Sequence, residues 1–441
     1  MQPRTRHARA TAPFDLSIDS LTHDGRGVGR YKGRAVFVNQ AVPGDTVTAR
    51  VVKQKASLWE AELDRILVPS PQRQEPGCPR YGVCGGCSLQ HLAHDGQLAA
   101  HTDVVLGQLK RSAGLEPDVL AEPLKSPVWG YRHRARLAVR WVNRKLLMGF
   151  RAASSNTIIP VDTCSVLAPE LEAMLPALEA TLKAATDPRA ISHIELAAGD
   201  DCQGILLRHI HPLSAQDQAR WQVFANEYHA NLWFQPNEPQ PLVCAHAPDG
   251  QESLTYRLPE FTLKLRFLPV DFIQVNPFIN RQMVNQAVDW LALSPTDTVL
   301  DLFCGLGNFT LPLARKAGQV VGVEGVESLV DKARDNARLN GMDNAVFSRA
   351  DLSEDITHQT WSQTDYDACL LDPPRTGARE VLERLVDRRP GRVMYVSCNP
   401  ATLARDAGIL KQYGYRLARL SVMDMFPQTV HVETMALFLR D

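Results

Sequence analysis

Cys398 stands where a thiol could act as a nucleophile. It follows an apolar run over residues 393–397, which predicts a buried strand, and it precedes Asn399-Pro400, which predicts the start of a helix. A cysteine at such a strand end can be held as a thiolate. A buried cysteine with only a packing role is the alternative. The position at the strand end favours the nucleophile.

Two residues near the C-terminus could accept a proton. The tail DMFPQTVHVETMALF contains His431 and Glu433. Glu433 precedes an apolar run that predicts the final strand, and burial there would raise the pKa of its carboxyl group toward neutrality. Either side chain could instead be a structural hydrogen-bonding group. We therefore expect a nucleophile and a base that come from different segments of the chain.

A turn that contains two glycines predicts a ligand pocket. The segment VLDLFCGLGNFT places Gly305 and Gly307 between an apolar strand and a helix, where glycine lets the backbone approach a ligand closely. The complete GxGxxG pattern of dinucleotide-binding proteins is absent, because Thr310 occupies its third glycine position. There is then less reason to place a pyrophosphate at the start of this helix.

Carboxylates follow successive predicted strands. Asp301 lies before the glycine turn, Glu324 ends the next strand, and Asp351 follows the strand after that. An acidic residue at such a position can bind both hydroxyls of a ribose, although each one alone could be an ordinary capping residue. Three together favour a pocket for S-adenosylmethionine. A further strand ends in LLDPPR, which adds Asp372, and Arg375 replaces the aromatic residue that amino-group methyltransferases often carry there.

Three cysteines form a closely spaced group. Cys78, Cys84 and Cys87 have the pattern Cys-x5-Cys-x2-Cys, with Gly85-Gly86 between the last two. Three thiolates are one short of a closed site, and Cys164 is the candidate fourth ligand. The spacing differs from a pair of Cys-x2-Cys knuckles, yet four thiolates suit zinc as well as an iron–sulfur cluster. The residues alone do not decide between zinc and an iron–sulfur cluster.

The region 125–151 is strongly basic, with eight Lys or Arg residues and no Asp or Glu. Basic and apolar residues alternate, which predicts a strand with one basic face, a turn at Asn143 and Arg144, and a return strand. Without acidic partners the like charges would repel one another, so we predict contact with nucleic-acid phosphates over a merely solvated face. The residues expected to make this contact are Arg132, Arg134, Arg136 and Arg140.

Several elements must position these residues. Residues 14–68 contain short β-branched runs and a glycine-rich turn over residues 25–29, and they predict a small β-barrel. The proline-rich stretch 68–79 predicts a linker, and residues 95–110 predict an amphipathic helix. From about residue 270 strands and helices alternate, which predicts a parallel, doubly wound sheet.

The composition is that of a globular protein. The chain has 441 residues and a mass of 49.0 kDa, which suggests roughly two to four domains. The formal net charge of −1 excludes a simple polycationic tail, and no apolar run is long enough to span a membrane. Nine cysteines, with no apolar stretch behind the basic N-terminus to form a secretory signal, favour the cytoplasm over a disulfide scaffold.

Several motifs resemble those of RNA uracil-5-methyltransferases, which depend on S-adenosylmethionine. The motifs are FIQVN at 272–276, DLFCGLGNFT at 301–310, LDPPRTG at 371–377, SCNPATLARD at 397–406 and HVE at 431–433. Together they cover the C-terminal domain and are highly specific. The resemblance implies a Rossmann-like α/β catalytic domain over residues 269–441.

The resemblance also implies residue roles. Cys398 would be the nucleophile and Glu433 the base. The cofactor pocket would be lined by Gln274, Phe303, Asn308, Glu324, Asp351 and Asp372. Carbon 5 of uracil is too weak a nucleophile to attack a sulfonium methyl group, but a thiolate that adds to carbon 6 makes carbon 5 nucleophilic. A base must then remove the proton from carbon 5 so that the thiol can be eliminated.

The rest of the chain resembles the branch of this family that modifies bacterial 23S rRNA. Residues 10–70 resemble a TRAM domain, an OB-like RNA-binding barrel, and carry SLTHDGRGVGR and VFVNQAVPGD. Residues 76–268 resemble an α+β iron–sulfur domain, of which the stretch 93–124 could pack with the catalytic domain. The tRNA-modifying branch lacks the barrel and the cluster. The resemblance implies a structural [4Fe–4S] cluster held by Cys78, Cys84, Cys87 and Cys164.

We therefore expect a multidomain, monomeric, cytoplasmic enzyme that forms 5-methyluridine, of the uracil-1939 type, in folded or partly assembled 23S rRNA. The target base would be flipped into the catalytic domain, and no membrane contact is expected. The nearest alternatives are the same chemistry on another 23S uridine or on tRNA. A non-catalytic RNA-binding or ribosome-assembly factor is the alternative from another class, and the intact Cys398 and Glu433 argue against it.

Overall fold

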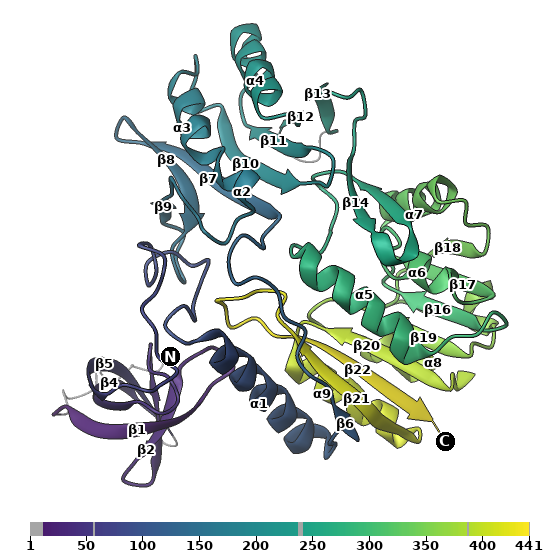
Figure 1. The fold of residues 1–441 in the computed structure, drawn as a ribbon, viewed down its shortest axis with the longest axis horizontal. Coiled ribbons are helices and arrows are strands. Elements are labelled where there is room, and N and C mark those ends of the chain that lie inside the picture. Colours follow the sequence, from purple (N-terminus) through teal and green to yellow (C-terminus); the bar gives the residue numbers. More distant parts are fainter. Residues whose placement is uncertain (1–11, 56–57, 237–240, 386–387, 441) are drawn as a thin grey trace, which may run out of the picture. The chain divides into compact units, whose positions relative to one another are not determined.

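The structure, a computed structural model, describes residues 12–55, 58–236, 241–385 and 388–440. The basic N-terminal stretch, and the first two residues of the barrel domain expected at 10–70, lie outside the described residues. The chain divides into two compact units, whose elements are labelled in Figure 1. The first unit runs to Gly107 and includes the distant segment Phe426–His431, and the second contains Gln108–Met425 and Val432–Asp441.

The first unit contains a closed β-barrel, which confirms the expected barrel. Its strand order is β1-β2-β3-β5-β4. The strands are β1 (Phe14–Leu21), β2 (Gly27–Tyr31), β3 (Arg34–Val38), β4 (Thr46–Gln54) and β5 (Leu58–Val68). Alternate residues of β1, namely Phe14, Leu16 and Ile18, are buried in the barrel core with Val36 and Val47. The period of two along the strand produces this inward face.

Two of the three glycines expected in a turn lie in a strand instead. Gly25 has a φ of +80° in the turn before β2, whereas Gly27 and Gly29 belong to β2. A Cβ atom at Gly29 would lie 2.3 Å from the carbonyl oxygen of Ser17, and one at Gly27 would lie 2.8 Å from that of Ala41. Glycine is required here because neighbouring backbones approach closely.

The segment that follows the barrel is anchored, which differs from the free linker expected there. Asp45 is fully buried, accepts a hydrogen bond of 2.9 Å from the backbone N–H of Ser70, and forms an ion pair of 2.6 Å with Arg73. Burial by itself would raise the pKa of Asp45, but hydrogen bonds from Arg73, Val42 and Ser70 lower it. The carboxylate therefore ties residues 70–73 to the barrel.

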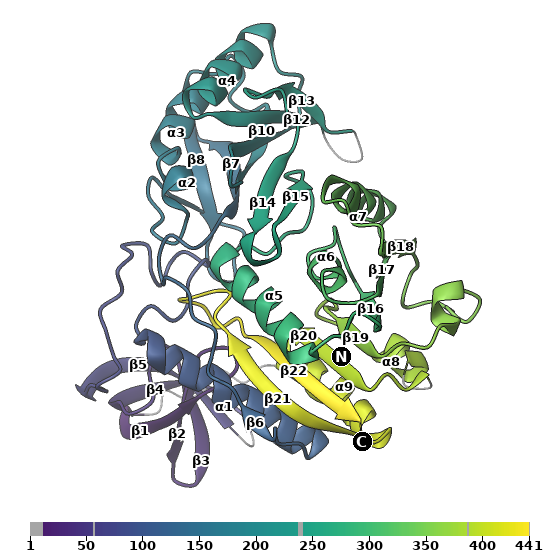
Figure 2. The same cartoon turned by 45° about the vertical axis from the view of Figure 1, so that its right-hand side comes forward.

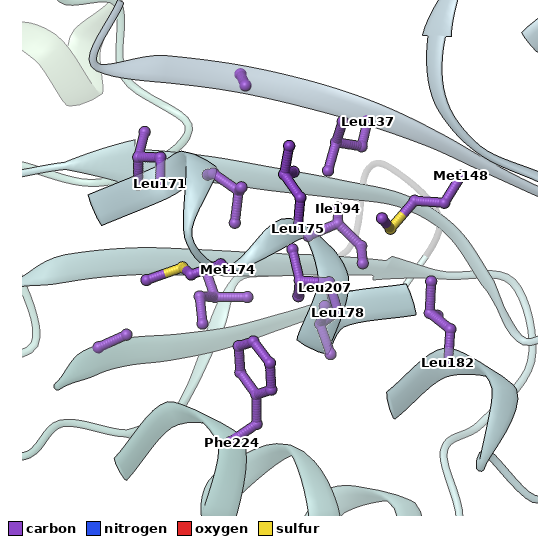
Figure 3. Packing of buried hydrophobic residues seen from close by; sticks show 14 of the residues in the cluster. Leu137, Met148, Leu171, Met174, Leu175, Leu178, Leu182, Ile194, Leu207 and Phe224 are labelled. Carbon is purple, nitrogen blue, oxygen red and sulfur yellow. The ribbon is translucent and has the colours of Figure 1, made fainter. Parts of the chain in front are cut away.

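The second unit begins with a sheet of order β13-β12-β11-β10-β7-β8-β9. Its strands are β7 (Arg134–Val142), β8 (Lys145–Arg151), β9 (Ile158–Pro160), β10 (Ile191–Ala198), β11 (Gln203–His209), β12 (Ala230–Pro236) and β13 (Val243–His246). Leu137, Ile194 and Leu207 of this sheet share one buried cluster with Leu178 of α3 (Leu175–Lys183) and Phe224 of α4 (Ala215–Glu227) (Figure 3). This core packs helices α3 and α4 against the sheet that contains the basic strands β7 and β8.

Strands β7 and β8 confirm the predicted basic strand and its return. They pair antiparallel, with Val142 opposite Lys145. Asn143 and Arg144 form the turn, with φ values of +50° and +61°. Positive φ at both central residues is typical of a two-residue hairpin whose twist matches the strands.

The second unit ends in a sheet of order β18-β17-β16-β19-β20-β22-β21-β6 (Figure 2). The strands are β6 (Val119–Leu120), β16 (Thr298–Leu302), β17 (Gln319–Glu324), β18 (Ala345–Arg349), β19 (Ala368–Leu371), β20 (Arg392–Ser397), β21 (Tyr415–Met423) and β22 (Glu433–Arg440). Strands β16 to β20 are parallel, so their carboxyl ends share one edge of the sheet. Ligands of such sheets bind at this edge.

This sheet is mixed, whereas a wholly parallel sheet was expected. Strand β22 is antiparallel to β20 and to β21, and β6 is parallel to β21. Strand β22 therefore lies between β20 and β21. Antiparallel neighbours need only a short connection, so no helix signal marks the return of the chain from β21 to β22.

Helices and a small hairpin complete the described residues. The helices not yet named are α1 (His94–Ala113), α2 (Pro169–Glu172), α5 (Pro277–Leu291), α6 (Thr310–Ala314), α7 (Glu327–Leu339), α8 (Arg379–Leu385) and α9 (Pro400–Gln412), with 3-10 turns η1 (Pro259–Phe261) and η2 (Thr360–Gln363). Strands β14 (Leu254–Leu258) and β15 (Leu263–Phe267) form the hairpin. None of the described helices is both long enough and apolar enough to cross a membrane.

Candidate functional site

The register of β20 and β22 brings the expected nucleophile and base together. Ser397, the last residue of β20, pairs with Thr434 of β22. Because the strands are antiparallel, Cys398 and Glu433 occupy the next position across the same pair. Side chains at directly opposed positions have Cβ atoms roughly 5 Å apart. The sheet therefore joins two residues that are separated by a helix and a strand in the sequence.

The environment of Cys398 raises the pKa of its thiol in the ligand-free protein. Burial is the main cause, and the carboxyl groups of Glu433 and Asp372 raise the pKa further, while Arg375 lowers it. The expected stabilised thiolate is therefore not favoured in this state, chiefly because burial disfavours the charged form of the thiol. These four side chains form one electrostatically coupled site.

The two carboxyl groups of this site hold their protons unusually tightly. Burial raises the pKa of Glu433 to about 8, with a further contribution from Asp372 and an opposing one from Arg375. Burial likewise raises the pKa of Asp372 to about 7. A pKa near neutrality suits a group that must take and release a proton during a reaction. Glu433 is among the groups that shift the pKa of Cys398, which supports Glu433 as the candidate base.

Arg375, whose role the sequence did not reveal, lies in a loop that is fixed by α9. The side chain of Asn399 donates a hydrogen bond of 3.0 Å to the backbone carbonyl of Arg375, and its oxygen caps α9 by accepting one from Ala401. Arg405 donates to the carbonyl of Thr376 at 2.9 Å. The residues that follow Cys398 in the sequence therefore hold the loop that supplies the positive charge.

Asp406, at the end of the SCNPATLARD motif, is a fully buried anchor for the same loop. Its carboxylate accepts hydrogen bonds from the backbone N–H of Ala378 at 2.8 Å and from the hydroxyl of Tyr395 at 2.6 Å. Arg405 also donates to it, at 2.7 Å. Strand β20, helix α9 and the loop after Asp372 are thus joined through one carboxylate.

The glycine turn after β16 has the strained backbone expected of a ligand-binding loop. Phe303 has a φ of +64°, which is rare for a bulky side chain, and Gly305 and Gly307 have φ values of +55° and +97°. Glu324, at the end of β17, accepts hydrogen bonds from Gly305 N–H at 3.2 Å and from Val326 N–H at 3.0 Å. The carboxylate expected at the cofactor ribose therefore also holds the turn.

Asp301 is fully buried beneath this turn. One of its oxygens accepts a hydrogen bond of 2.5 Å from the hydroxyl of Thr310. Its other oxygen is buried with no hydrogen-bond partner among the described residues. Burial raises the pKa of Asp301 to about 7, with additions from Asp372 and Glu324. A set of close carboxyl groups with an unsatisfied acceptor suits a cationic ligand, and S-adenosylmethionine carries an ammonium and a sulfonium.

Asn308 takes part in a network of amides that the sequence did not reveal. Asn308 and Asn280 donate to one another, at 2.9 and 3.0 Å, and the hydroxyl of Tyr256 donates to Asn308 at 2.9 Å. Asn280 and Tyr256 also line a small cavity with Gln274. The network joins the glycine turn to α5 and to the β14–β15 hairpin, and two of its members line the same cavity as Gln274.

The loop that carries Gln274 is held at both ends. Arg134 donates to the backbone carbonyls of Pro269 and Asp271, and Lys332 forms an ion pair with Asp271. Burial lowers the pKa of Arg134. One of the arginines expected to contact RNA is therefore engaged by the protein backbone in this structure.

Asn276, the last residue of FIQVN, fixes the other end of that loop. It is fully buried and caps α5 by accepting a hydrogen bond from Ile279 N–H. Its amide also donates to the backbone carbonyls of Asp424 and Met425, both at 3.3 Å. The motif therefore has a structural role beside the expected cofactor contact of Gln274.

Asp351 is exposed at the loop after β18. Its carboxylate accepts hydrogen bonds from the backbone N–H of Ser353 at 2.9 Å and from the Ser353 hydroxyl at 2.6 Å, and both bonds lower its pKa. Asp351 thus caps its own turn at the same sheet edge as Glu324. Its contact with a cofactor stays a prediction.

The basic strands have an acidic partner that their own segment does not contain. Glu195 of β10 lies opposite Arg136 of β7, 3.6 Å from its guanidinium, and forms an ion pair of 2.5 Å with Arg208. The expectation of an unpaired basic face is therefore wrong, because the partner comes from a strand distant in the sequence. Arg136 and Arg140 remain exposed, and Arg132 donates to the backbone carbonyl of Arg134 at 2.9 Å. Their contact with RNA stays a prediction.

The cysteines of the expected cluster are partly buried. The thiol pKa of Cys84 is raised by burial and by the nearby Cys78, and Gly86 N–H donates to the Cys84 sulfur at 3.4 Å. Among the described residues, no three His, Cys, Asp or Glu side chains are arranged as a ligand set for a metal ion. Cys164 lies in the second unit, where its backbone N–H donates to Glu172 at 2.7 Å.

Comparisons with known proteins agree with this geometry. Residues 252–441 match the family model of tRNA (Uracil-5-)-methyltransferase, and residues 14–63 match the TRAM domain. The chain is 47% identical to 23S rRNA (uracil(1939)-C(5))-methyltransferase RlmD of Pseudomonas putida, over 96% of this chain and 93% of that protein. It is 45% identical to the protein of the same name from Alkalilimnicola ehrlichii, over 99% of both chains.

A solved structure shows the same fold. The tRNA (uracil-54, C5)-methyltransferase of Pyrococcus abyssi, crystallised with S-adenosyl-L-homocysteine, aligns with a TM-score of 0.73 and 26% identity. The alignment covers 97% of this chain and all of that chain. The fold of the whole chain is thus that of a protein solved with the demethylated cofactor. Since that protein is named for a tRNA uridine and the alignment leaves out only 3% of this chain, the expectation that tRNA-modifying relatives lack the barrel is wrong.

Replacement of Gly377 by alanine should disturb the loop that carries Asp372 and Arg375. Gly377 has a φ of +81°, and a Cβ there would lie 2.4 Å from Arg405 and 2.6 Å from Asp406. We expect Gly377→Ala to lower methyl transfer at least tenfold, with a destabilisation of about 1–3 kcal/mol. Gly408→Ala is the control on α9, because a Cβ there meets only one atom, at 3.9 Å. Equal activity of the two variants in a methyl-transfer assay would contradict this role of Gly377.

Asp372 should make the stability of the ligand-free protein depend on pH. Its folded pKa of about 7 lies above the usual 3.8, so between these values the unfolded state loses a proton that the folded state keeps. The free energy of unfolding therefore falls as pH rises through this window. Asp372→Asn should raise the melting temperature by about 5 °C at pH 8.5, and less at pH 5.

The same variant should lose S-adenosylmethionine binding at least tenfold, measured by calorimetry, because a carboxylate that is expected to face the cationic cofactor is gone. The exposed Asp365→Asn serves as the matched control, with no change expected in either measurement. A melting-temperature difference for Asp372→Asn that is the same at both pH values would contradict the assigned burial of the charge.

Proposed function

Since this chain belongs to the 23S rRNA uracil-5-methyltransferase family, we propose that it methylates carbon 5 of uridine 1939 in 23S rRNA through a covalent intermediate on Cys398. The names of the relatives that match nearly the whole chain support the substrate. The TRAM domain and the exposed basic side chains of β7 support an RNA partner. The proposal includes a monomer that acts in the cytoplasm on folded or partly assembled rRNA.

The pairing of Ser397 with Thr434 is the observation that carries the mechanism. It sets Cys398 and Glu433 side by side at the sheet edge where Glu324 and Asp372 also end their strands. A uracil placed at this edge would have the thiol near carbon 6 and the carboxylate near carbon 5. S-adenosylmethionine bound beside it supplies an electrophilic methyl group.

The proposed reaction consists of addition of the thiolate, methyl transfer and elimination. Cys398 releases its proton to solvent, and the thiolate forms a bond with carbon 6, which moves an electron pair through carbon 5 to oxygen 4 as an enolate. The enolate returns the pair through carbon 5, which would take the methyl group as the bond from that methyl to the sulfonium sulfur breaks and its electron pair stays on the sulfur. Glu433 removes the proton from carbon 5, and the electrons of that bond restore the double bond as the Cys398 sulfur leaves.

The charges of the site suit these steps. The guanidinium of Arg375 lowers the pKa of both Cys398 and Glu433, so it favours the thiolate and the carboxylate that the reaction needs. A cationic cofactor near Asp372 acts in the same direction. The raised pKa values of the ligand-free site therefore mean that full activation requires the bound cofactor.

RNA contact is assigned to the barrel and to the basic hairpin. On the barrel, Arg34 lies over the ring of Trp59 and Lys32 over that of Tyr31, a combination that suits stacking of bases and neutralisation of phosphates. On the hairpin, Arg136 and Arg140 are the exposed candidates. Contacts of this kind position the RNA, and the catalytic domain reads the flipped base.

A [4Fe–4S] cluster on Cys78, Cys84, Cys87 and Cys164 is also part of the proposal. The spacing of the first three cysteines and the family resemblance support it. The contribution of Cys78 to the raised thiol pKa of Cys84, together with the N–H directed at the Cys84 sulfur, suits thiolate ligands of a cation. The cluster would have a structural role.

Metal analysis tests this assignment. Protein purified without oxygen should contain about four iron and four sulfide ions per chain, and Cys164→Ser should lose most of both. Cys202→Ser, which replaces a buried cysteine outside the group, is the control and should keep them. Zinc without sulfide in the parent protein would contradict the cluster.

Variants of the catalytic pair test the mechanism. In single-turnover assays with labelled S-adenosylmethionine, the parent protein should methylate a 23S rRNA fragment that contains uridine 1939, and Cys398→Ala should lose at least 1000-fold in rate. Glu433→Gln should form the methylated covalent adduct but release it at least 100-fold more slowly, because no base removes the proton. The adduct is detected as an RNA–protein band that resists SDS.

Two outcomes would contradict the proposal. Activity that survives in Cys398→Ala would exclude the covalent mechanism. Transfer of label to tRNA and not to the 23S fragment would exclude the substrate, which matters because the Pyrococcus abyssi protein of similar fold is named for a tRNA uridine.

A further inference from the structure

The segment that leads into the catalytic base belongs to the first unit by its contacts. Residues 426–431 connect β21 to β22, yet they cluster with the N-terminal part of the chain. The backbone carbonyl of Gln428 accepts hydrogen bonds from Ser88 N–H at 2.8 Å and Leu89 N–H at 2.9 Å. Val430 N–H donates to the Ser88 hydroxyl at 3.0 Å.

Gln97 of α1 holds the same segment through its side chain. Its oxygen accepts a hydrogen bond of 2.9 Å from Gln428 N–H, and its nitrogen donates to the Gln428 side-chain oxygen at 3.1 Å. The same nitrogen also donates to the backbone carbonyls of Leu89 and Leu92, at 3.1 and 2.8 Å. We call this reciprocal pair of amides the Gln97–Gln428 clamp.

The clamp is a buried polar contact that includes a strained backbone conformation, and both features suggest a role beyond packing. Gln97 and Gln428 are 1% and 2% exposed, so both amides are removed from water. A buried polar network fixes one conformation, whereas apolar residues could fill the same space without the risk of unsatisfied groups. Gln428 also has a φ of +69°, a strained conformation for a residue with a side chain.

The clamp lies close in sequence to the proton-accepting group. Glu433 is the first residue of β22 and follows Gln428 after only four residues. On the other side of the segment, Asn276 binds the carbonyls of Asp424 and Met425. The chain that precedes Glu433 is thus held at two places, at Asp424 and Met425 within the second unit and at Gln428 within the first.

We infer that the Gln97–Gln428 clamp positions Glu433 for removal of the proton from carbon 5, which makes Gln97 a positioning residue for the elimination step. The inference rests on the proposed function, because it assumes that Glu433 is the base. Methyl transfer itself is assigned to Cys398, which follows β20, and to the cofactor, whereas the clamped segment leads directly into Glu433 of β22. Loss of the clamp should therefore slow one step selectively.

Gln97→Leu tests this selectivity. It keeps the size of the side chain and removes all four hydrogen bonds. In single-turnover assays with the 23S fragment, we expect methyl transfer within about threefold of the parent rate and adduct release at least tenfold slower. The methylated, SDS-resistant adduct should therefore accumulate.

Two further variants make the result decisive. Gln108→Leu places the same substitution on the same helix, where the Gln108 side chain bonds with Ser112 and Arg111 of that helix, and it should release product at the parent rate. Gln428→Gly keeps the backbone bonds and relieves the positive φ, so it should fold even if Gln97→Leu does not. It should slow adduct release by a smaller factor, about threefold.

The outcomes separate this inference from the proposed function. Suppose that Glu433→Gln accumulates adduct. If Gln97→Leu and Gln428→Gly then slow methyl transfer and adduct release by the same factor, or if both variants release product at the parent rate, the clamp is only structural and the inference is wrong. If Glu433→Gln itself accumulates no adduct, the assignment of the base fails first. Selective accumulation in the clamp variants, and not in Gln108→Leu, supports the inference.

Discussion

The antiparallel insertion of β22 beside β20 is the constraint on which the site depends. A sheet of parallel strands alone can gather strand ends at one edge, and it does so for Glu324 and Asp372. It cannot bring in a residue that starts a strand. Because β22 runs in the opposite direction, its first residue, Glu433, meets the end of β20 at Cys398. The hydrogen-bond ladder of two strands thereby sets the proposed nucleophile beside the proposed base.

The same edge concentrates carboxyl groups at a cost to stability. Burial raises the pKa values of Asp301 and Asp372 to about 7 and that of Glu433 to about 8, so the ligand-free fold resists their ionisation. Arg375 offsets part of this effect. The pKa values of the buried carboxyl groups still stay raised, and the positive charge of a cationic cofactor would lower them. In the proposed mechanism, the positive charge of the bound cofactor would therefore also favour the ionised forms of the catalytic pair.

Local patterns predicted much of this arrangement. Apolar runs of strand length, each followed by glycine or a carboxylate, located Asp301, Glu324 and Asp372 at strand ends, and the alternation of basic and apolar residues located the β7–β8 hairpin. The family motifs led to Cys398 and Glu433. Contacts between distant segments could not be predicted in this way. Tyr256 and Asn308, or Gln97 and Gln428, meet only because of the tertiary fold.

The groups that interact with the arginines of β7 could not be predicted from local patterns either. Glu195 reaches Arg136 from another strand, and the guanidinium of Arg134 faces backbone carbonyls of the loop before Gln274. The pKa of Cys398 is raised, opposite to the expectation, chiefly because the thiol is buried and also because Glu433 and Asp372 add negative charge from distant segments.

The central claim is that Cys398 bonds to carbon 6 while Glu433 removes a proton from carbon 5. An RNA fragment with 5-fluorouridine at the target position tests it most directly, since fluorine cannot leave carbon 5 as a proton does. After reaction with S-adenosylmethionine and digestion, mass spectrometry should find the methylated fluorouridine attached to the peptide that contains Cys398. An adduct on another cysteine, or no adduct from a preparation that methylates the uridine fragment, would contradict the account.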